Sequence, residues 1–426
     1  MLLSLVAFTL MLGTPRPFVH AQTPVIEPAN IEPANAVPAD ATPPAPQNPD
    51  NDQYDKLVEA ERRYRGIADG GGWPAIPDGD PMKPGERYEC SRLEALEKRL
   101  AAEGYRGSTD SAQPAPAAPK AAAPEADAPK AGANAAATAD CEYGPTLASA
   151  VNDFQYDRYL VSDGIVGGQT LRQLVKPVAD VVSKIDYALQ RWRANAANLS
   201  GAYILVNIPT FELAVYEGRR EVLRMPVIVG LPDWETPELS DKIEYIVINP
   251  SWNIPKSIAD SEVLPKRQKD KGYFEREGIV ANGDGMLSQK PGPRNSLGRL
   301  KFMLPNRQDI YLHDTPGKQR FASPARAFSH GCIRVEKPVD LAAYLLKDDP
   351  QWSKERIQSA IDSGDSKDVK LPQPMPVHLL YIPALVSEDG RLRVAPDIYD
   401  KVGNAGDESA SEPAPTEEDE FLPDWP

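Results

Sequence analysis

The sequence predicts a multidomain protein in which a small three-helix domain is followed by a mostly-β domain with flanking helices. Three observations predict this fold class. Apolar residues repeat at helical spacing up to about residue 199, and from Gly201 onward they alternate as in half-buried strands. A run rich in Ala, Pro, Ser and Lys over residues 107–140 interrupts the helical part and cannot build a core. The 426 residues are enough for two or three domains of roughly 100–200 residues each.

The ends of the chain predict export at one end and a solvated tail at the other. Residues 1–13 are nearly all apolar, but a bilayer span takes about 20 residues. Val19-His20-Ala21 follows with small residues suited to cleavage, so we expect a signal peptide over residues 1–21. No Lys or Arg precedes the apolar run, so an upstream start or an uncleaved membrane anchor is the alternative. Residues 402–426 hold eight acidic residues and no Lys or Arg, which predicts a disordered tail.

Composition narrows the class of partner. The net charge of −15 argues against nucleic acid, because phosphate binding needs a cationic face. The 44 prolines indicate that part of the chain is not globular. Residues 22–50 fit that description, since they are Pro/Ala-rich and predict a semi-extended linker. The cysteine count is three, and an odd cysteine in an exported protein is a candidate reactive thiol.

Residues 54–176 predict a helical scaffold and a small helical domain. A first helix begins near Tyr54 and ends at Gly70-Gly71-Gly72-Trp73-Pro74. The next helix is expected over residues 91–103, with Ser91 as its N-cap in a capping box with the glutamate three residues later.

After the low-complexity insertion 107–140 the helical pattern resumes, and a connecting helix is expected over residues 178–199. The resumed pattern contains Phe154-Gln155, Leu160, Asp163-Gly164, Gly167, Thr170 and Leu174. On these residues the pieces resemble a three-helix peptidoglycan-binding module whose first helix precedes the insertion. Small packed helices without a ligand would show the same apolar positions.

Residues 201–400 predict the mostly-β domain. Tyr203–Ile208 is an apolar run, and Phe211, Leu213 and Val215 alternate with less apolar neighbours, as in a half-buried strand. Further strands are expected at residues 222–229, 245–248, 377–383 and 392–395, and helices at 339–346 and 354–363.

Two strings in this domain carry residues suited to nucleophilic catalysis: Tyr311-Leu312-His313-Asp314 and Ser329-His330-Gly331-Cys332-Ile333-Arg334. A thiol becomes a strong nucleophile when a nearby imidazole takes its proton. A glycine beside the cysteine leaves backbone N–H groups unobstructed for a developing oxyanion. Either His313 or His330 could be the base, and spacing alone does not decide between them. A zinc site and an inert buried cysteine are the weaker alternatives, and no His-Glu-x-x-His string is present.

These strings resemble the signature of the L,D-transpeptidase (YkuD) family, in which a histidine and a spacer precede Ser/Thr-His-Gly-Cys-x-Asn/Arg. The resemblance implies that Cys332 is the nucleophile and His313 the base, oriented by the backbone carbonyl of Asp314. It also implies an oxyanion pocket built by backbone N–H groups, with Gly331 among them. Arg334 would bind a substrate carboxylate through its planar fork. Further residues expected at the substrate are Ser329, His330, Tyr311 and Trp252, although the two aromatic residues also suit plain packing.

The resemblance covers about residues 54–400 apart from the insertion, and it extends to the long YcbB-like branch of the family. In that branch the segment corresponding to residues 256–297 forms a lid over the active site. At about forty residues it is longer than ordinary loops, and a plain surface loop is the alternative. The strings that carry this resemblance are Gly71-Gly72-Trp73-Pro74, Asn249-Pro250-Ser251-Trp252-Asn253-Ile254-Pro255, Pro291-Gly292-Pro293-Arg294-Asn295-Ser296-Leu297-Gly298 and Phe302-Met303-Leu304-Pro305-Asn306.

The family implies a cysteine acyltransferase that works in the periplasm on peptidoglycan without a cofactor or metal. The Cys332 thiolate would attack diaminopimelate in a tetrapeptide donor stem, release D-alanine and form a thioester. The side-chain amine of an acceptor diaminopimelate would then close a 3→3 cross-link, and carbapenems would act as inhibitors. Two other functions stay open. One is a same-fold hydrolase or protein-attachment enzyme, and the other is a non-catalytic protein that binds the cell wall.

Cys90 and Cys141 are expected to form a disulfide. Export places the protein in an oxidising compartment, where disulfides persist, and Cys332 must stay free to react. The two cysteines bracket the insertion, each just before a helix of the small domain. Two unrelated buried cysteines are the alternative.

Overall fold

The computed structural model describes residues 52–107, 140–283 and 285–403. The expected signal peptide, the Pro/Ala-rich linker, nearly all of the insertion and the acidic tail lie outside the described residues. Within the described ranges, no helix combines the length and the apolar character needed to cross a membrane.

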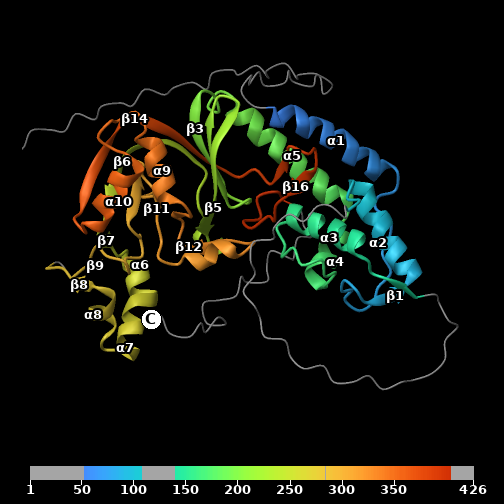
Figure 1. Ribbon diagram of the computed structural model, residues 1–426, viewed down its shortest axis with the longest axis horizontal. Helices are drawn as coiled ribbons and strands as arrows, with labels where there is room; N and C mark the ends of the chain where they lie inside the picture. The colour runs from blue at the N-terminus through green and yellow to red at the C-terminus, as the bar shows by residue number, and fades with distance from the viewer. Residues whose placement is uncertain (1–51, 108–139, 284, 404–426) are drawn as a thin grey trace, which may run out of the picture. The chain divides into compact units, whose positions relative to one another are not determined.

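The described residues of the helical part form five helices and a two-stranded antiparallel sheet. Figure 1 shows how these helices are arranged. Three of the helices, α2, α3 and α4, share one core in which Leu96, Leu100, Val151 and Phe154 are fully buried. These residues recur three or four positions apart, so they form one face of each helix. The bounds are α1 Gln53–Asp69, β1 Arg87–Glu89, α2 Cys90–Glu103, β2 Asp140–Glu142, α3 Pro145–Asp157, α4 Gly168–Val175 and α5 Val178–Asn195.

The expected capping of α2 is wrong. The helix begins at Cys90 with Glu89 at the N-cap position, and no side chain caps it. Ser91 therefore lies in the first turn rather than before it. The reason is that strand β1 runs directly into the helix, whose first residue is the disulfide cysteine, so pairing of β1 with β2 sets the start of α2 in place of a side-chain cap.

The second part is built on a sheet with the strand order β12-β5-β13-β11-β10-β6-β14-β3-β4, and a further β4–β5 pairing closes it. The sheet is mixed, because β11–β13, β12–β5 and β14–β3 are parallel pairs. Its bounds are β3 Ala202–Asn207, β4 Glu212–Glu217, β5 Arg220–Gly230, β6 Leu239–Ile248, β10 Leu300–Met303, β11 Leu312–His313, β12 Ala327–Ser329, β13 Ile333–Val335 and β14 Lys367–Leu380.

Helices α9 (Pro338–Leu345) and α10 (Lys354–Asp362) pack their apolar residues into the core of this sheet. Short 3-10 turns, η1 Pro232–Trp234 and η3 Lys318–Ala322, join its strands. Strand β14 is longer than expected, since it starts ten residues before the apolar run at 377 and passes through Pro372, Pro374 and Pro376. Proline lacks an N–H to donate, and the register between β14 and β6 shifts between Lys370 and Met375.

The segment expected to form a lid folds into short helices and a three-stranded sheet of order β7-β9-β8. It has a small core of its own, in which Ile254, Val263, Phe274 and Leu287 are buried. Figure 1 shows this segment in yellow, with α6, α7 and α8 together. The bounds are β7 Trp252–Asn253, α6 Lys256–Ile258, η2 Ala259–Val263, α7 Leu264–Lys269, α8 Tyr273–Glu277, β8 Ile279–Ala281 and β9 Leu287–Gln289.

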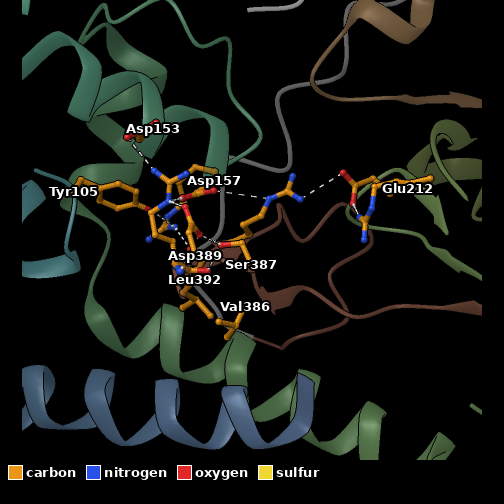
Figure 2. Close-up of polar contacts among 12 residues, drawn as sticks. Tyr105, Asp153, Asp157, Glu212, Val386, Ser387, Asp389 and Leu392 are labelled. Atoms are coloured by element: carbon orange, nitrogen blue, oxygen red, sulfur yellow. Dashed lines mark hydrogen bonds and ion pairs between the residues drawn. The ribbon is translucent and has the colours of Figure 1, made fainter. Parts of the chain in front are cut away.

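A cluster of buried and partly buried charges ties the C-terminal hairpin, β15 (Ala384–Val386) and β16 (Leu392–Val394), to its neighbours. Arg391 pairs with Asp153 and Asp157 of α3, and Arg393 pairs with Asp157 and with Glu212 of β4. The three carboxylates are labelled in Figure 2. We call these arginines and carboxylates, together with Arg99, Glu103 and Arg158, the charge cluster. Within it, Arg99 Nη1 lies 2.8 Å from Glu103 Oε1, and Arg158 pairs with the other oxygen of the same carboxylate.

Candidate active site

Strand register brings the sequence-predicted residues together. In the parallel pair β11–β13, Leu312 lies opposite Ile333 and His313 opposite Arg334. Leu312 and Ile333 are fully buried in the core. Because side chains alternate along a strand, His313 and Arg334 lie on the other face, together with Tyr311 and Cys332. We call the four residues His313, Arg334, Tyr311 and Cys332 the catalytic face.

The Cys332 thiol is half-buried, and it is the free cysteine of the described chain. Its Sγ lies 3.7 Å from the backbone oxygen of Asp309. Burial raises the pKa of the thiol, and the backbone and hydroxyl of Tyr311 together with the charge of Lys301 oppose that rise only in part. The thiol is therefore protonated near neutral pH and needs a base to become a nucleophile.

His313 is the buried imidazole of the site, with 5% of its surface exposed. Its Nδ1 lies 2.5 Å from the backbone oxygen of Asp314, the carbonyl expected to orient it. Burial, together with the charges of Arg334 and Lys301, lowers the pKa of His313 to about 3, and the hydrogen bonds with the backbone of Asp314 and Leu297 oppose this fall only in part. A neutral imidazole can accept a proton. Within the described residues no hydrogen bond joins His313 to Cys332, although the two side chains lie on the same face.

The Asp314 side chain fixes the carbonyl that orients His313. Its carboxylate accepts the backbone N–H of Arg299 at 2.8 Å and that of Thr315 at 2.7 Å. Lys318 Nζ lies 2.7 Å from the same carboxylate. Gly298 has a φ of +62°, and a Cβ there would lie 2.4 Å from this carboxylate. Sequence reasoning assigned only the carbonyl of Asp314, and the role of its carboxylate was missed.

Two expectations about the signature loop are wrong in this structure. The backbone N–H of Gly331 donates to Ser329 Oγ at 3.2 Å, so it is not open to an oxyanion. Ser329 is 2% exposed, and its hydroxyl donates to the backbone oxygen of Cys332 at 2.6 Å. Ser329 therefore supports the loop and does not face a substrate. The reason is local, because a serine two residues before Gly331 captures that N–H in a tight turn. The N–H of Cys332 donates to no group among the described residues.

His330 contacts the lid segment. Its Nε2 lies 2.7 Å from Glu262 Oε1, and its ring meets Trp234 edge-on at a centroid distance of 5.1 Å. The hydrogen bond with His330 lowers the pKa of Glu262. The segment therefore closes onto the signature loop through a specific polar contact. Neither Glu262 nor Trp234 was identified from sequence, because both are far from His330 in the chain.

Lys301 is a further functional candidate that sequence reasoning missed. It pairs with His313 in register across β10–β11, and its Nζ lies 3.8 Å from the centroid of the Tyr311 ring. Burial lowers the pKa of Lys301. Burial also raises the pKa of Tyr311, whose hydrogen-bond neighbours include Cys332 and Trp252. A lysine within an otherwise apolar short strand was the available signal. Trp252 is thus connected to the site by its hydrogen bond with Tyr311.

The described residues contain no group of three or more His, Cys, Asp or Glu side chains placed to hold a metal ion. Of the zinc set weighed from sequence, His330 contacts Glu262 and His313 contacts a backbone carbonyl.

Cys90 and Cys141 are bonded to each other, with an S–S distance of 1.95 Å and a Cα–Cα distance of 4.8 Å. The bond joins the start of α2 to β2. These two points lie on either side of the insertion in the sequence.

The motif residues of the helical domain hold its fold. Gln155 is 1% exposed, and its Nε2 donates to Asp163 Oδ1 at 2.9 Å and to Thr170 Oγ1 at 3.0 Å. Its Oε1 accepts the N–H of Gly164 at 2.9 Å. The amide thus satisfies the turn between α3 and α4. These contacts explain the sequence string without invoking a bound glycan.

Comparison with known proteins identifies both parts. Residues 201–353 match the family model described as the L,D-transpeptidase catalytic domain (YkuD). Residues 130–174 match a model described as a peptidoglycan binding domain. The second match starts inside the insertion and includes α3 and α4 but not α2, although α2 shares their core.

A Haemophilus influenzae protein assigned as an L,D-transpeptidase is 32% identical over 241 residues, which is 52% of this chain and 48% of that protein. The chain thus spans about half the length of this relative. Among solved structures, an L,D-transpeptidase from Mycobacterium smegmatis covers 42% of this chain and 59% of its own at 13% identity and a TM-score of 0.23. An E. faecium L,D-transpeptidase catalytic domain acylated by ertapenem covers 43% and 98% at 12% identity and a TM-score of 0.22.

The protein therefore combines a mostly-β catalytic domain with a helical peptidoglycan-binding domain. Residues 201–353 match the catalytic domain of the YkuD family of L,D-transpeptidases.

Proposed function

We propose that this protein forms 3→3 cross-links between peptidoglycan stem peptides through a thioester on Cys332. One observation carries the proposal. Within the segment matched to the catalytic domain, strand register sets a protonated thiol and a neutral, buried imidazole on one face of the same sheet. This is the arrangement that nucleophilic acyl transfer requires.

In the acylation step His313 takes the thiol proton, and Cys332 Sγ bonds to the carbonyl carbon of diaminopimelate in a tetrapeptide donor. The carbonyl electrons move to its oxygen, and the backbone N–H of Cys332 donates a hydrogen bond to this oxyanion. When the tetrahedral intermediate collapses, the C–N bond breaks, and D-alanine leaves with the proton held by His313. Arg334 binds a carboxylate of the donor and fixes its register.

In the second step the side-chain amine of an acceptor diaminopimelate attacks the thioester. His313 takes the proton from this amine, the C–S bond breaks, and the Cys332 sulfur leaves as a thiolate that recovers the proton. Carbapenems would acylate the same sulfur and block both steps. The substrate lies outside the cytoplasmic membrane, which agrees with the proposed export through residues 1–21.

The test is incubation of purified protein with defined disaccharide-tetrapeptides, followed by mass spectrometry. A covalent dimer that has lost D-alanine supports cross-linking. A shortened monomer means that water is the acceptor and the protein is a hydrolase. Unchanged tetrapeptide, with retention on cell-wall sacculi, would indicate the non-catalytic binding protein. Adding a candidate acceptor protein to the same mixture tests the protein-attachment reaction.

A further inference from the structure

A buried threonine lies directly behind the peptide bond that precedes Cys332. Thr236 is 2% exposed and stands in the loop after β5, nearly a hundred residues before the signature. Its hydroxyl donates to the backbone oxygen of Gly331 at 2.8 Å. The same oxygen atom accepts the backbone N–H of Gly230 at 2.9 Å. Because a lone pair of the Thr236 hydroxyl oxygen faces the N–H of Gly230, the hydroxyl hydrogen points to the backbone oxygen of Gly331.

The Gly331 carbonyl and the Cys332 N–H belong to one planar peptide unit and point in opposite directions. A hydrogen bond that holds the carbonyl therefore also sets the direction of the N–H. Gly331 has a φ of +104°, in a region where little but glycine is stable, so the peptide has a wide choice of orientations without an outside restraint. The N–H of Gly331 is taken by Ser329, whereas the N–H of Cys332 has no hydrogen-bond acceptor among the described residues.

The loop that carries Thr236 is itself held at both ends. The backbone N–H of Thr236 donates to Tyr399 Oη at 3.1 Å, and this hydroxyl donates to the backbone oxygen of Gly230 at 2.6 Å. A Cβ at Gly230 would lie 1.9 Å from the backbone oxygen of Trp234, so only glycine lets the loop fold back this tightly. Gly230, Thr236 and Tyr399 thus form a closed set of hydrogen bonds, all in the interior.

We propose that Thr236 is a positioning residue that aims the backbone N–H of Cys332 at the developing oxyanion, and that Tyr399 holds Thr236 in place for this purpose. The inference rests on the proposed acyl-transfer function. It predicts that Thr236 affects steps that build negative charge on a carbonyl oxygen and leaves the intrinsic reactivity of the sulfur alone.

The test compares two reactions of the same sulfur in the full-length protein. Acylation by the carbapenem imipenem passes through an oxyanion, whereas alkylation by iodoacetamide displaces iodide at a saturated carbon and makes none. For Thr236→Val we expect acylation to slow about tenfold, less than the 10²–10³ that loss of a whole oxyanion donor costs, while alkylation is unchanged. Thr236→Ser keeps the hydroxyl and should restore acylation. Tyr399→Phe should show the same pattern more weakly.

Thr210→Val is the matched control. It removes an equally buried hydroxyl, which donates to the backbone oxygen of Asn207 at 3.1 Å, away from the signature loop. This variant should react at the wild-type rate with both reagents. Equal acylation rates for wild type and Thr236→Val would overturn the inference. So would a parallel loss of both reactions in the valine variant, because that pattern means a damaged fold or thiol. If wild-type protein is alkylated but neither acylated by imipenem nor active on tetrapeptides, the proposed function itself has failed.

Discussion

The charge cluster and the catalytic face both bury ionisable side chains, but the charges that surround those side chains differ. In the charge cluster, burial alone would raise the pKa of Glu103, yet Arg158 and Arg99 bring it below its usual range. The carboxylate is therefore ionised and paired. On the catalytic face, His313 is equally buried, but its partners are backbone carbonyls and its charged neighbours are the cations Arg334 and Lys301.

This difference separates a structural use of burial from a chemical one. Burying an ion pair carries a desolvation cost, but removing one partner leaves an uncompensated buried charge and costs far more. The cluster therefore resists separation of elements that are distant in sequence (Figure 2). An imidazole without an opposite charge stays neutral, and that is the form a proton acceptor needs. Burial thus makes the ion pairs of the charge cluster costly to break, whereas on the catalytic face it keeps the His313 imidazole neutral.

The largest expected effect on the catalytic face is that of Cys332→Ala. Removing the thiol leaves no nucleophile, so turnover of tetrapeptide should fall to the background rate. The fold should be unaffected, because the side chain is half-buried and belongs to neither the disulfide nor the charge cluster. Muropeptide turnover and circular dichroism measure the two effects. Appreciable residual turnover in a folded variant would exclude the cysteine mechanism.

Glu103→Gln should lower the stability of the fold and leave the reactivity of Cys332 unchanged. It leaves Arg99 and Arg158 buried without their anion, and breaking such a pair costs about 3–5 kcal/mol. We expect urea unfolding to show that loss while the folded protein alkylates at Cys332 at the wild-type rate. Glu97→Gln is the control, because Glu97 is exposed on the same helix, and such a change should stay within about 0.5 kcal/mol. Unchanged stability in Glu103→Gln would mean that the cluster is not structural.

Arg334→Lys tests whether a cation on the catalytic face binds substrate. A hydrogen bond to a charged group is worth roughly 1.5–3 kcal/mol, and the lysine loses the planar fork. We therefore expect kcat/KM for tetrapeptide to fall about tenfold or more. Arg219→Lys, on the exposed turn between β4 and β5, should change nothing. If Arg334→Lys also matches wild type, Arg334 has a structural role.

The smallest effect concerns the pH dependence of the thiol. Burial raises the pKa of Cys332, so the thiolate forms only at a pH above the ordinary thiol range. Alkylation by iodoacetamide should rise about tenfold per pH unit through neutral pH, with no plateau there. Lys301→Met removes a charge that favours the thiolate, so its profile should move to higher pH. Lys242→Met, on exposed β6 surface, should not move it. A plateau near neutral pH would instead show a resting thiolate.

Local patterns were enough for the parts of the site that lie close in sequence. The change of period at Gly201 predicted the division between helices and strands, and the string around Cys332 supplied the candidate nucleophile. The assignment of His313 as base came from family resemblance, and its place beside the cysteine strand then followed from the register of β11 with β13. The length of β14 was not predictable, because its prolines hide a strand that only pairing with β6 reveals.

The amino-acid sequence by itself determined which chemical groups this protein owns and which short elements carry them, because side-chain chemistry and local periodicity are properties of neighbouring residues. Only the tertiary structure decided what surrounds those groups. Lys301, Glu262 and Thr236 reach the signature from three other segments, and the N–H of Gly331 proved to be taken by Ser329. Strand pairing and burial act between residues far apart in the chain, and they alone set the pKa values and backbone orientations on which the chemistry depends.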